Sequence, residues 1–387
     1  MRMFVLHLRA WLALLLALEL PLLCYAAEDE DEFGEPAVQA ARFYRNPEER
    51  REAGLGRQLT DWLLFSGLLE IEKEYLENKF KNNITTTEDD GAVPTIEAVF
   101  ELTIFPWLVG EFVFEAEYDT GYFARADEIL IAIESETWGL KIGRQNLPFG
   151  EYYSHFVSGP LLEFGETRAT SLIADHSFND NFEVSAFVFD SDFGEPSGND
   201  NYDWGLAVEY VSSNEAIRFG ASYLSDLAET DERLLEEHIY TYKKRVSAWS
   251  AYALIGFDSF ELTAEIVQAR RTLTHFETPA TEVEQDEESE DGEVEEVTGF
   301  KPTSYNLELA YFPQPHLQFA VRVEHSDELE DEPEWRYGVS ATWRIGKYVG
   351  VSLDYLYGDY KNDFVLDDND NALDHSHQVA VQVVVEF

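Results

Sequence analysis

Three clusters of polar residues in this 387-residue chain have types and spacings that could support chemistry. Asp367, Asn369 and Asn371 are spaced like the first ligands of a calcium-binding EF-hand loop. However, Ala372 stands where that loop needs a glycine, and Gln378 stands where it needs its final glutamate. The run is therefore not an EF-hand, and we expect no resident metal or other cofactor.

A second cluster follows directly. His375 and His377, with Asp374 beside them, could together hold a divalent ion weakly. The simpler interpretation, which we favour, is a polar loop in contact with solvent.

The third cluster is Asp175, His176 and Ser177, which contains the residue types of a hydrolytic triad. Consecutive residues of a strand point to opposite faces, so these three cannot form a relay. The sequence also has no nucleophile-elbow or zinc-helix motif. We therefore predict that the protein is not an enzyme.

Charged residues elsewhere alternate with apolar ones along short segments. From Leu108 onward, Phe112, Phe114 and other apolar residues fall on one face, and Glu111, Glu115 and Glu117 fall on the other. A charge that faces lipid near the midplane costs about 2–4 kcal/mol, so the glutamates should face water. The pattern indicates strands with one lipid face and one aqueous face.

Sixteen segments show this alternation. They are Ser66–Leu76, Pro94–Phe105, Leu108–Thr120, Asp127–Ser135, Thr137–Arg144, Arg168–Phe178, Asn181–Asp190, Tyr202–Val211, Ala216–Asp226, Val246–Gly256, Ser259–Ala269, Thr303–Phe312, His316–His325, Trp335–Ile345, Val349–Asp359 and Ser376–Phe387. The joint after every even-numbered segment is tight, and the joint after every odd-numbered one is longer. Outer-membrane barrels alternate short periplasmic turns and longer external loops in this way.

The predicted fold is therefore all-β, a transmembrane antiparallel β-barrel of about sixteen strands with a short N-terminal periplasmic extension. The strands of a soluble β-sandwich also alternate apolar and polar residues, so periodicity alone does not distinguish the two folds. The loop rhythm, the leader sequence and the terminal aromatic Phe387 favour the barrel in a bacterial outer membrane. Expected partners are membrane lipid and lipopolysaccharide, with Phe387 as the signal to the barrel assembly machinery. The oligomeric state stays open.

Three regions are expected along the chain. Residues 1–26 read as a signal peptide, because two arginines precede an apolar run shorter than the roughly 20 residues of a spanning helix. Residues 27–62 read as the periplasmic extension, and 63–387 as the barrel. The net charge of −50 argues against nucleic acid as a partner, since the two would repel.

Two external loops differ from the others. Ten of the 21 residues of 278–298 are acidic and the segment has no apolar periodicity, so we expect a disordered external loop. Residues 145–167 are rich in aromatic, aliphatic, glycine and proline residues, which predicts an ordered loop. It either folds into the lumen as a constriction or packs as a cap on the rim. Its candidate solute-contacting residues are Arg144, Glu151, His155, Glu163, Glu166 and Arg168.

The lumen wall should carry charges of both signs on different strands. Its acidic members are Glu97, Glu101, Glu111, Glu115 and Glu117, and its basic members are Arg218, Arg322, Arg336 and Arg344. Separated walls of opposite sign would place a transverse field across the bore. Alternatively, the charges pair locally and only keep the pore wet.

The ordered loop also carries a family resemblance. The runs GRQNLPFG (143–150), SHFVSGPL (154–161) and EFGETRATS (163–171) resemble the corresponding segment of the LbtU family of siderophore porins. The resemblance implies a barrel without a plug domain that takes part in iron-siderophore uptake. The residues themselves predict only a passive channel for small solutes. A general cation-preferring porin and a surface binding protein with a sealed barrel stay open as alternatives.

Overall fold

The structure is a computed structural model that describes residues 54–89, 91–118, 122–179, 181–190, 202–227, 240–242, 244–273, 275–277, 300–329, 332–361, 365 and 371–387. The predicted signal peptide, the acidic loop 278–298, most of the predicted extension, and Asp367 and Asn369 lie outside these residues. None of the described residues form a helix long and apolar enough to cross a membrane.

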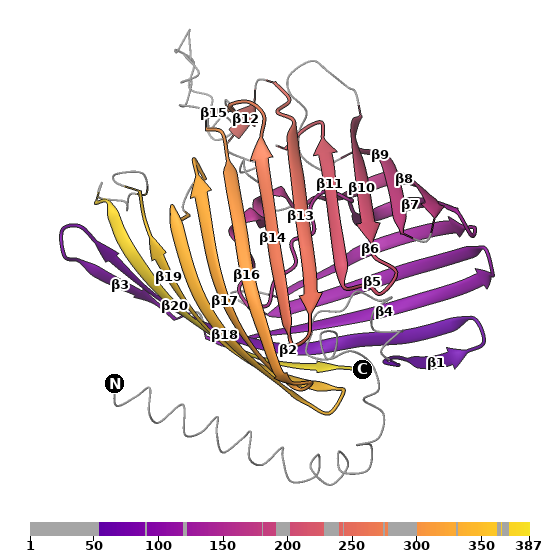
Figure 1. The fold of residues 1–387 in the computed structure, drawn as a ribbon, viewed down its shortest axis with the longest axis horizontal. Helices are drawn as coiled ribbons and strands as arrows, with labels where there is room; N and C mark the ends of the chain where they lie inside the picture. Colours follow the sequence, from indigo (N-terminus) through magenta and orange to yellow (C-terminus); the bar gives the residue numbers. More distant parts are fainter. Residues whose placement is uncertain are drawn as a thin grey trace, which may run out of the picture.

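Sixteen antiparallel strands form a closed ring (Figure 1). They are β2 (Leu63–Phe80), β4 (Val93–Phe105), β5 (Leu108–Tyr118), β6 (Tyr122–Glu134), β7 (Trp138–Asn146), β8 (Arg168–Asn179), β9 (Phe182–Asp190), β10 (Asp203–Val211), β11 (Ile217–Leu224), β13 (Ala248–Phe257), β14 (Phe260–Ala269), β16 (Thr303–Gln314), β17 (Leu317–Asp327), β18 (Trp335–Ile345), β19 (Val349–Asp359) and β20 (Leu373–Glu386). The ring closes because β2 pairs with β4 on one side and with β20 on the other. The predicted strand number and fold class are confirmed.

Four further strands are short. β1 (Arg57–Thr60) and β3 (Thr85–Glu88) pair with β2, and β12 (Tyr240–Tyr242) pairs with β15 (His275–Glu277) in a separate two-stranded sheet. β1 lies within the segment assigned to the periplasmic extension. Its hydrogen bonding to β2 makes these four residues part of the sheet.

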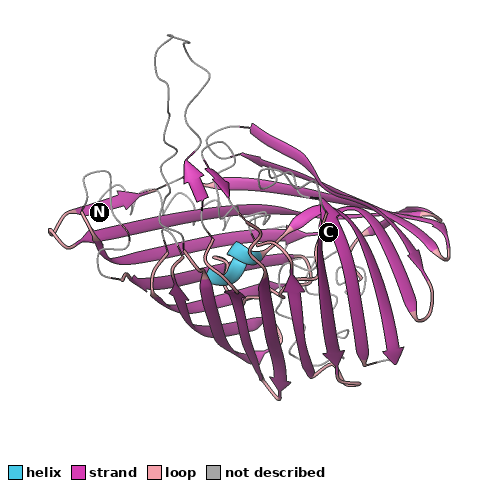
Figure 2. Ribbon diagram, turned by 90° about the horizontal axis from the view of Figure 1, so that it is seen from above, coloured by secondary structure: helices cyan, strands magenta, loops and turns pink. Residues whose placement is uncertain are grey.

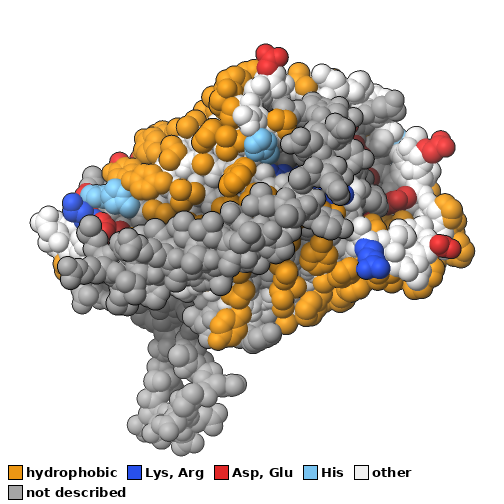
Figure 3. All heavy atoms as spheres, turned by 90° about the horizontal axis from the view of Figure 1, so that it is seen from below, with side chains coloured by type: hydrophobic (Ala, Val, Ile, Leu, Met, Phe, Trp, Pro, Cys, Tyr) orange, Lys and Arg blue, Asp and Glu red, His pale blue; other side chains and the backbone are white. Residues whose placement is uncertain are grey.

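The two faces of the ring differ in polarity. Apolar side chains that point outward are about half exposed, among them Ile131 (49%), Val339 (53%) and Trp343 (50%). Figure 3 shows hydrophobic side chains over much of the outer strand surface, with charged ones at its margins. The inward positions hold serines, threonines and charged residues, many of them buried. A β-sandwich would have the reverse arrangement, so the alternation belongs to a barrel with an apolar exterior.

The C-terminal residue seals the seam between the first and last strands. The Gly67 N–H donates to the Phe387 carbonyl (2.9 Å), and the Phe387 N–H donates to the Gly67 carbonyl (3.0 Å). The Phe387 ring lies 5.6 Å from that of Phe65. A Cβ on Gly67 would lie 2.2 Å from the Glu97 carbonyl oxygen and 3.1 Å from the Phe387 ring, so only glycine permits this approach.

Candidate functional site

The segment between β7 and β8 lies inside the barrel. It ends in a short 3-10 helix, η1 (Leu161–Gly165), and Figure 2 shows this helix within the ring of strands. Leu161, Leu162, Phe164 and Gly165 of η1 are buried. Of the two placements left open by the sequence, the folded-in position is the one that the contacts below describe.

Carboxylates of the barrel wall hold the backbone of this loop. Each points inward from its strand and is at least 95% buried. Glu265 of β14 accepts hydrogen bonds from the backbone N–H groups of Glu151 (2.8 Å) and Tyr152 (2.9 Å). Glu308 of β16 accepts from the N–H of His155 (2.8 Å), Glu324 of β17 from that of Leu161 (2.7 Å), and Asp354 of β19 from that of Val157 (2.5 Å). A buried carboxylate is costly unless it is hydrogen-bonded, so the loop and these walls satisfy each other.

Two arginines complete the attachment from the same wall. The fully buried Arg322 guanidinium donates to the carbonyls of Ser158 (2.9 Å) and Gly159 (3.0 Å), and its Nε donates to Glu308 (2.8 Å). Arg336 donates from Nη2 to the Gly159 carbonyl and from Nε to Glu324 (both 2.5 Å). The barrel wall therefore provides acceptors for the N–H groups of the loop backbone and donors for its carbonyl groups.

Apolar contacts fix the loop at two further places. Phe149, Leu162 and Phe164 belong to a buried cluster with Phe187 and Phe189 of β9 and with side chains of β8, β11 and β14. Phe156 belongs to a second cluster with Ala310, Phe312, Ala320 and Leu356, and the Arg322 guanidinium lies 4.2 Å from its ring centre. An apolar core inside a barrel means that the loop is packed against the wall.

One glycine of the loop has a clear steric role. Gly150 adopts a φ of 79°, and a Cβ there would lie 2.5 Å from the Tyr152 ring. Burial raises the pKa of the Tyr152 phenol well above its usual value, so the group stays neutral in its packed position. The sequence predicts an ordered loop partly from its glycine content, and Gly150 is a position at which the backbone requires glycine.

The six candidate residues of the loop have different environments. Glu151 accepts from Arg218 of β11 (2.7 Å), and Arg168 donates to Asp127 of β6 (2.5 Å). Glu163 and Glu166 are partly exposed.

Two of the six are not placed to meet a passing solute. His155 is 5% exposed, with Nε2 3.3 Å from Glu261 and Nδ1 3.3 Å from Gln318, so it anchors the loop. Arg144 pairs with Ile129 and Thr170, whose positions alternate with the inward-facing ones. Its position therefore belongs to the outer face.

The acidic wall contains like-charged neighbours. Glu97 lies directly opposite Glu115, and Glu101 lies directly opposite Glu111, across the β4–β5 pair. Glu111 and Glu115 are partly exposed, as is Glu117. Like charges in direct cross-strand pairs destabilise a sheet, so packing alone does not account for this arrangement.

The predicted basic wall is compensated locally. Arg322 and Arg336 pair with Glu308 and Glu324 beneath the loop, and Arg344 pairs with Glu386 at 3.1 Å. Arg218, about one-third exposed, lies between Glu151 and Glu209 at 2.7 Å from each. These four arginines therefore pair locally with carboxylates, as in the alternative to a basic wall considered from the sequence. The fixed charge that remains partly exposed on β4 and β5 is acidic.

The anchoring residues could not be recognised from the sequence. Glu265, Glu308, Glu324 and Asp354 read only as polar lumen positions, and nothing in their spacing distinguishes a covered wall from an open one. A weak signal existed for the apolar patch, because the run from Ala186 to Phe189 in β9 is apolar on both faces. Such a run is typical of a strand buried on both sides.

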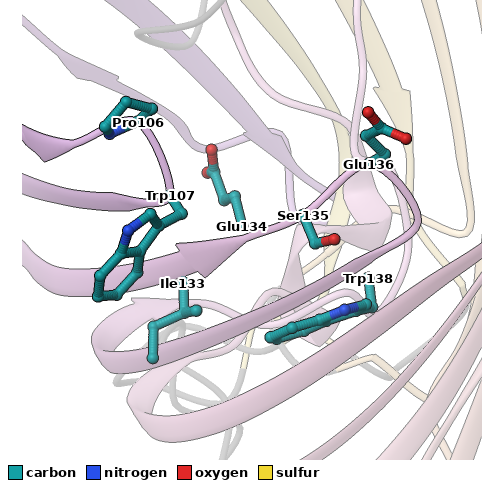
Figure 4. A pocket seen from close by; sticks show the side chains of 7 residues that line it. All are labelled: Pro106, Trp107, Ile133, Glu134, Ser135, Glu136 and Trp138. Atoms are coloured by element: carbon teal, nitrogen blue, oxygen red, sulfur yellow. The ribbon is translucent and has the colours of Figure 1, made fainter.

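A pocket of about 710 Å³ lies away from this loop, at the tight-turn end of β4–β7. Trp107, Ile133 and Trp138 project to one side of the turns, and the carboxylates of Glu134 and Glu136 project to the other (Figure 4). Both tryptophans are about half exposed, which is typical of the aromatic girdle at a membrane interface. We assign the pocket to that girdle.

Neither a scan of family models nor a search of curated proteins gave a match to this sequence. Solved structures match over most of the chain. The chain has the fold of outer-membrane porins.

Three of the matching structures illustrate the likeness. An anion-selective porin from Comamonas acidovorans has a TM-score of 0.57 at 8% identity, covering 84% of this chain and 99% of its own. OmpF of Salmonella typhi, solved with daunomycin, has a TM-score of 0.57 at 13% identity over 86% and 100%. The outer-membrane channel DcaP of Acinetobacter baumannii has a TM-score of 0.56 at 9% identity over 86% and 100%. At such identities the likeness establishes the fold.

Proposed function

We propose that the protein is a passive channel of the bacterial outer membrane for small polar solutes, with the loop of residues 147–167 as its constriction. The observation that carries the proposal is the attachment of this loop inside the bore to β14 and β16–β19. A loop held by buried carboxylates, two arginines and two apolar clusters keeps a fixed position. A fixed segment inside a barrel sets the narrowest radius, which is how a pore selects by size.

We propose further that the channel prefers cations. Beneath the loop Glu308 and Glu324 are paired with Arg322 and Arg336, whereas β4 and β5 carry five glutamates, Glu97, Glu101, Glu111, Glu115 and Glu117, of which Glu115 is paired with Arg125 of β6. Acidic side chains in a bore attract cations and repel anions. The preference should weaken at high salt, where the Debye length falls to about 3 Å at 1 M.

Single-channel recording in planar bilayers tests the proposal. Deletion of residues 147–166 should raise conductance and relax solute discrimination, while the barrel stays assembled through its interstrand hydrogen bonds. Deletion of the acidic residues 278–298 is the matched control and should change selectivity slightly and conductance hardly at all. If only the second deletion opens the pore, the constriction lies elsewhere. If the wild type conducts nothing, the barrel is sealed and a surface binding role replaces the channel.

Iron-siderophore uptake is the second, finer candidate. It is supported by the coincidence of two features: the run that resembles the LbtU family is the same run that enters the lumen. A segment that a solute must pass is the segment in which substrate preference should be encoded. Iron-starved cells lacking the protein should take up the transported siderophore more slowly than the wild type. Normal uptake of every siderophore would remove this substrate and leave the channel proposal intact.

A further inference from the structure

The two histidines near the start of β20 share one face of a regular strand. His375 and His377 lie at alternate positions, in register with the outward-facing Val379 and Val381. The polar loop that we favoured is therefore wrong for His375, which belongs to the strand, while His377 lies within the predicted strand Ser376–Phe387 as well as the observed one. Being at the loop end of β20, they lie beyond the apolar stretch that runs from Val379 to Phe387.

The separation of the two rings suits a chelate. Their centroids are 5.4 Å apart, and the planes meet at 88°. A transition metal lies about 2.0–2.1 Å from an imidazole nitrogen, hence about 3.2 Å from the ring centre. Two imidazoles on one ion would then have centroids about 5.2 Å apart at the tetrahedral angle that suits Zn²⁺ and about 4.5 Å apart at the 90° angle of a tetragonal Cu²⁺ or Ni²⁺ site. The observed separation is close to the tetrahedral value and within about 1 Å of the tetragonal one.

The other ring nitrogens are already held. His375 Nδ1 lies 2.9 Å from the Asp374 carboxylate, and His377 Nδ1 lies 2.8 Å from the Tyr355 hydroxyl. Metal-ligating histidines characteristically donate their second N–H to an oxygen in this way, which fixes the tautomer and directs the free nitrogen at the metal. With Nδ1–H as the donor, Nε2 is the ligand atom in both residues. Spacing and second-nitrogen contacts thus point to a metal independently.

The surroundings are polar and of mixed charge. Asp359 and Lys79 lie opposite His375 on the two neighbouring strands, and Tyr357 and Glu77 lie opposite His377. Among the described residues there is no group of three histidine, cysteine or acidic side chains able to hold a metal. Two imidazoles with water at the remaining positions are therefore the site.

We propose that His375 and His377 form a bidentate surface site for a divalent transition metal of the Cu²⁺, Ni²⁺ or Zn²⁺ class, bound through both Nε2 atoms. These borderline ions prefer imidazole ligands, whereas Mg²⁺ and Ca²⁺ prefer oxygen. The site lies on the outer surface near the external rim and is independent of the proposed channel function.

Cu²⁺ titration of the folded full-length barrel in detergent tests the proposal, with calorimetry for affinity and electron paramagnetic resonance for the number of bound imidazoles. His375→Asn and His377→Asn should each lower the affinity of one site at least tenfold and remove the two-nitrogen signature. Tyr355→Phe should lower it less, because the ligand remains and only its orientation is lost.

The control is His325→Asn, since His325 is also outward-facing and lies among aromatic rings, 4.4 Å from that of Trp335. It should leave the affinity unchanged. Gel mobility before and after boiling verifies that each variant is folded. Equal affinity in the wild type and His377→Asn, or a spectrum with a single imidazole at equimolar Cu²⁺, would overturn the proposal.

Discussion

Substitution of Arg322 by alanine should loosen the loop of residues 147–167 without unfolding the barrel. The guanidinium donates to three loop oxygens, those of Ser154, Ser158 and Gly159, and pairs with Glu308. Hydrogen bonds that involve a charged group contribute about 1.5–3 kcal/mol each, so three give a ceiling of roughly 5–9 kcal/mol. Such contributions are not additive, and the removal of one partner of a buried ion pair costs about 3–5 kcal/mol in practice.

This cost falls mainly on the position of the loop. At about 1.4 kcal/mol per factor of ten, it shifts the balance between docked and released loop by roughly two to four powers of ten. The contacts with Glu265 and Glu324 and the Phe149 cluster remain in the variant. We therefore expect brief excursions to a larger conductance in place of permanent release, on the microsecond to millisecond scale of loop motions.

Single-channel recording of Arg322→Ala against Arg344→Ala measures the effect. Arg344 is also buried (4% exposed), but it pairs with Glu386 and donates to the Lys347 carbonyl at the tight-turn end of β18. Both variants lose a buried arginine, and only the first loses contacts with the loop. If the two variants show equal current noise, or if Arg322→Ala matches the wild type, the loop is not held as described.

Three further predictions concern the glutamates of β4 and β5, the Phe149 cluster and the closed sheet. Glu101→Gln together with Glu111→Gln should lower the cation preference, measured as the zero-current potential in a salt gradient; anion preference of the wild type would contradict the acidic surface on β4 and β5. Phe149→Ala removes the ring from its cluster at a cost of about 3–5 kcal/mol and should increase current noise, while unchanged noise would show that the cluster does not hold the loop. The folded protein should migrate differently on a gel before and after boiling, because a closed sheet has no edge from which to open; identical mobility with mainly helical circular dichroism would refute the barrel.

The strand count followed from the sequence because lipid penalises every charge on the outer face. The bounds of the strands were predicted wrongly at ends that lie beyond the lipid, because a charge on the outer face carries no such penalty there. β2 was predicted as Ser66–Leu76 but extends to Phe80, since its outward positions Glu77 and Lys79 lie beyond the apolar stretch and break the alternation. The start of β6 was missed for another reason. Val113 pairs with Glu128 and Phe114 with Ala126, so Asp127 is a bulge that inverts the pattern.

The site was predicted only in outline. Composition predicted an ordered loop, but the carboxylates that accept from its backbone lie 113 to 197 residues away in the chain. Because the loop donates through its backbone N–H groups, its side chains carry no pattern that would reveal the carboxylates that accept from it. His155 shows the limit clearly, because a histidine in a pore loop suggests contact with solute, and only the fold reveals that it is buried against Gln318 and Glu261.

The cross-strand register predicts which charges of the lumen pair with one another, whereas composition does not. The tight turn between β16 and β17 places Glu308 opposite Arg322, and the β17–β18 register places Glu324 opposite Arg336. Counting charges strand by strand separates these partners and suggests a basic wall. Counting them across strands cancels Arg322 against Glu308 and Arg336 against Glu324.

On β4 and β5 the same counting places glutamate opposite glutamate, Glu97 opposite Glu115 and Glu101 opposite Glu111, and on its other side Glu115 has Arg125 of β6 at 3.5 Å. Cation preference should therefore respond to substitution of these residues far more than to the loss of equal charge beneath the loop. A carboxylate beneath the loop already shares its charge with an arginine or with backbone N–H groups, and is shielded from the bore by the packed chain. The distribution of uncompensated charge, and not the net charge of the protein, determines the field that a solute meets.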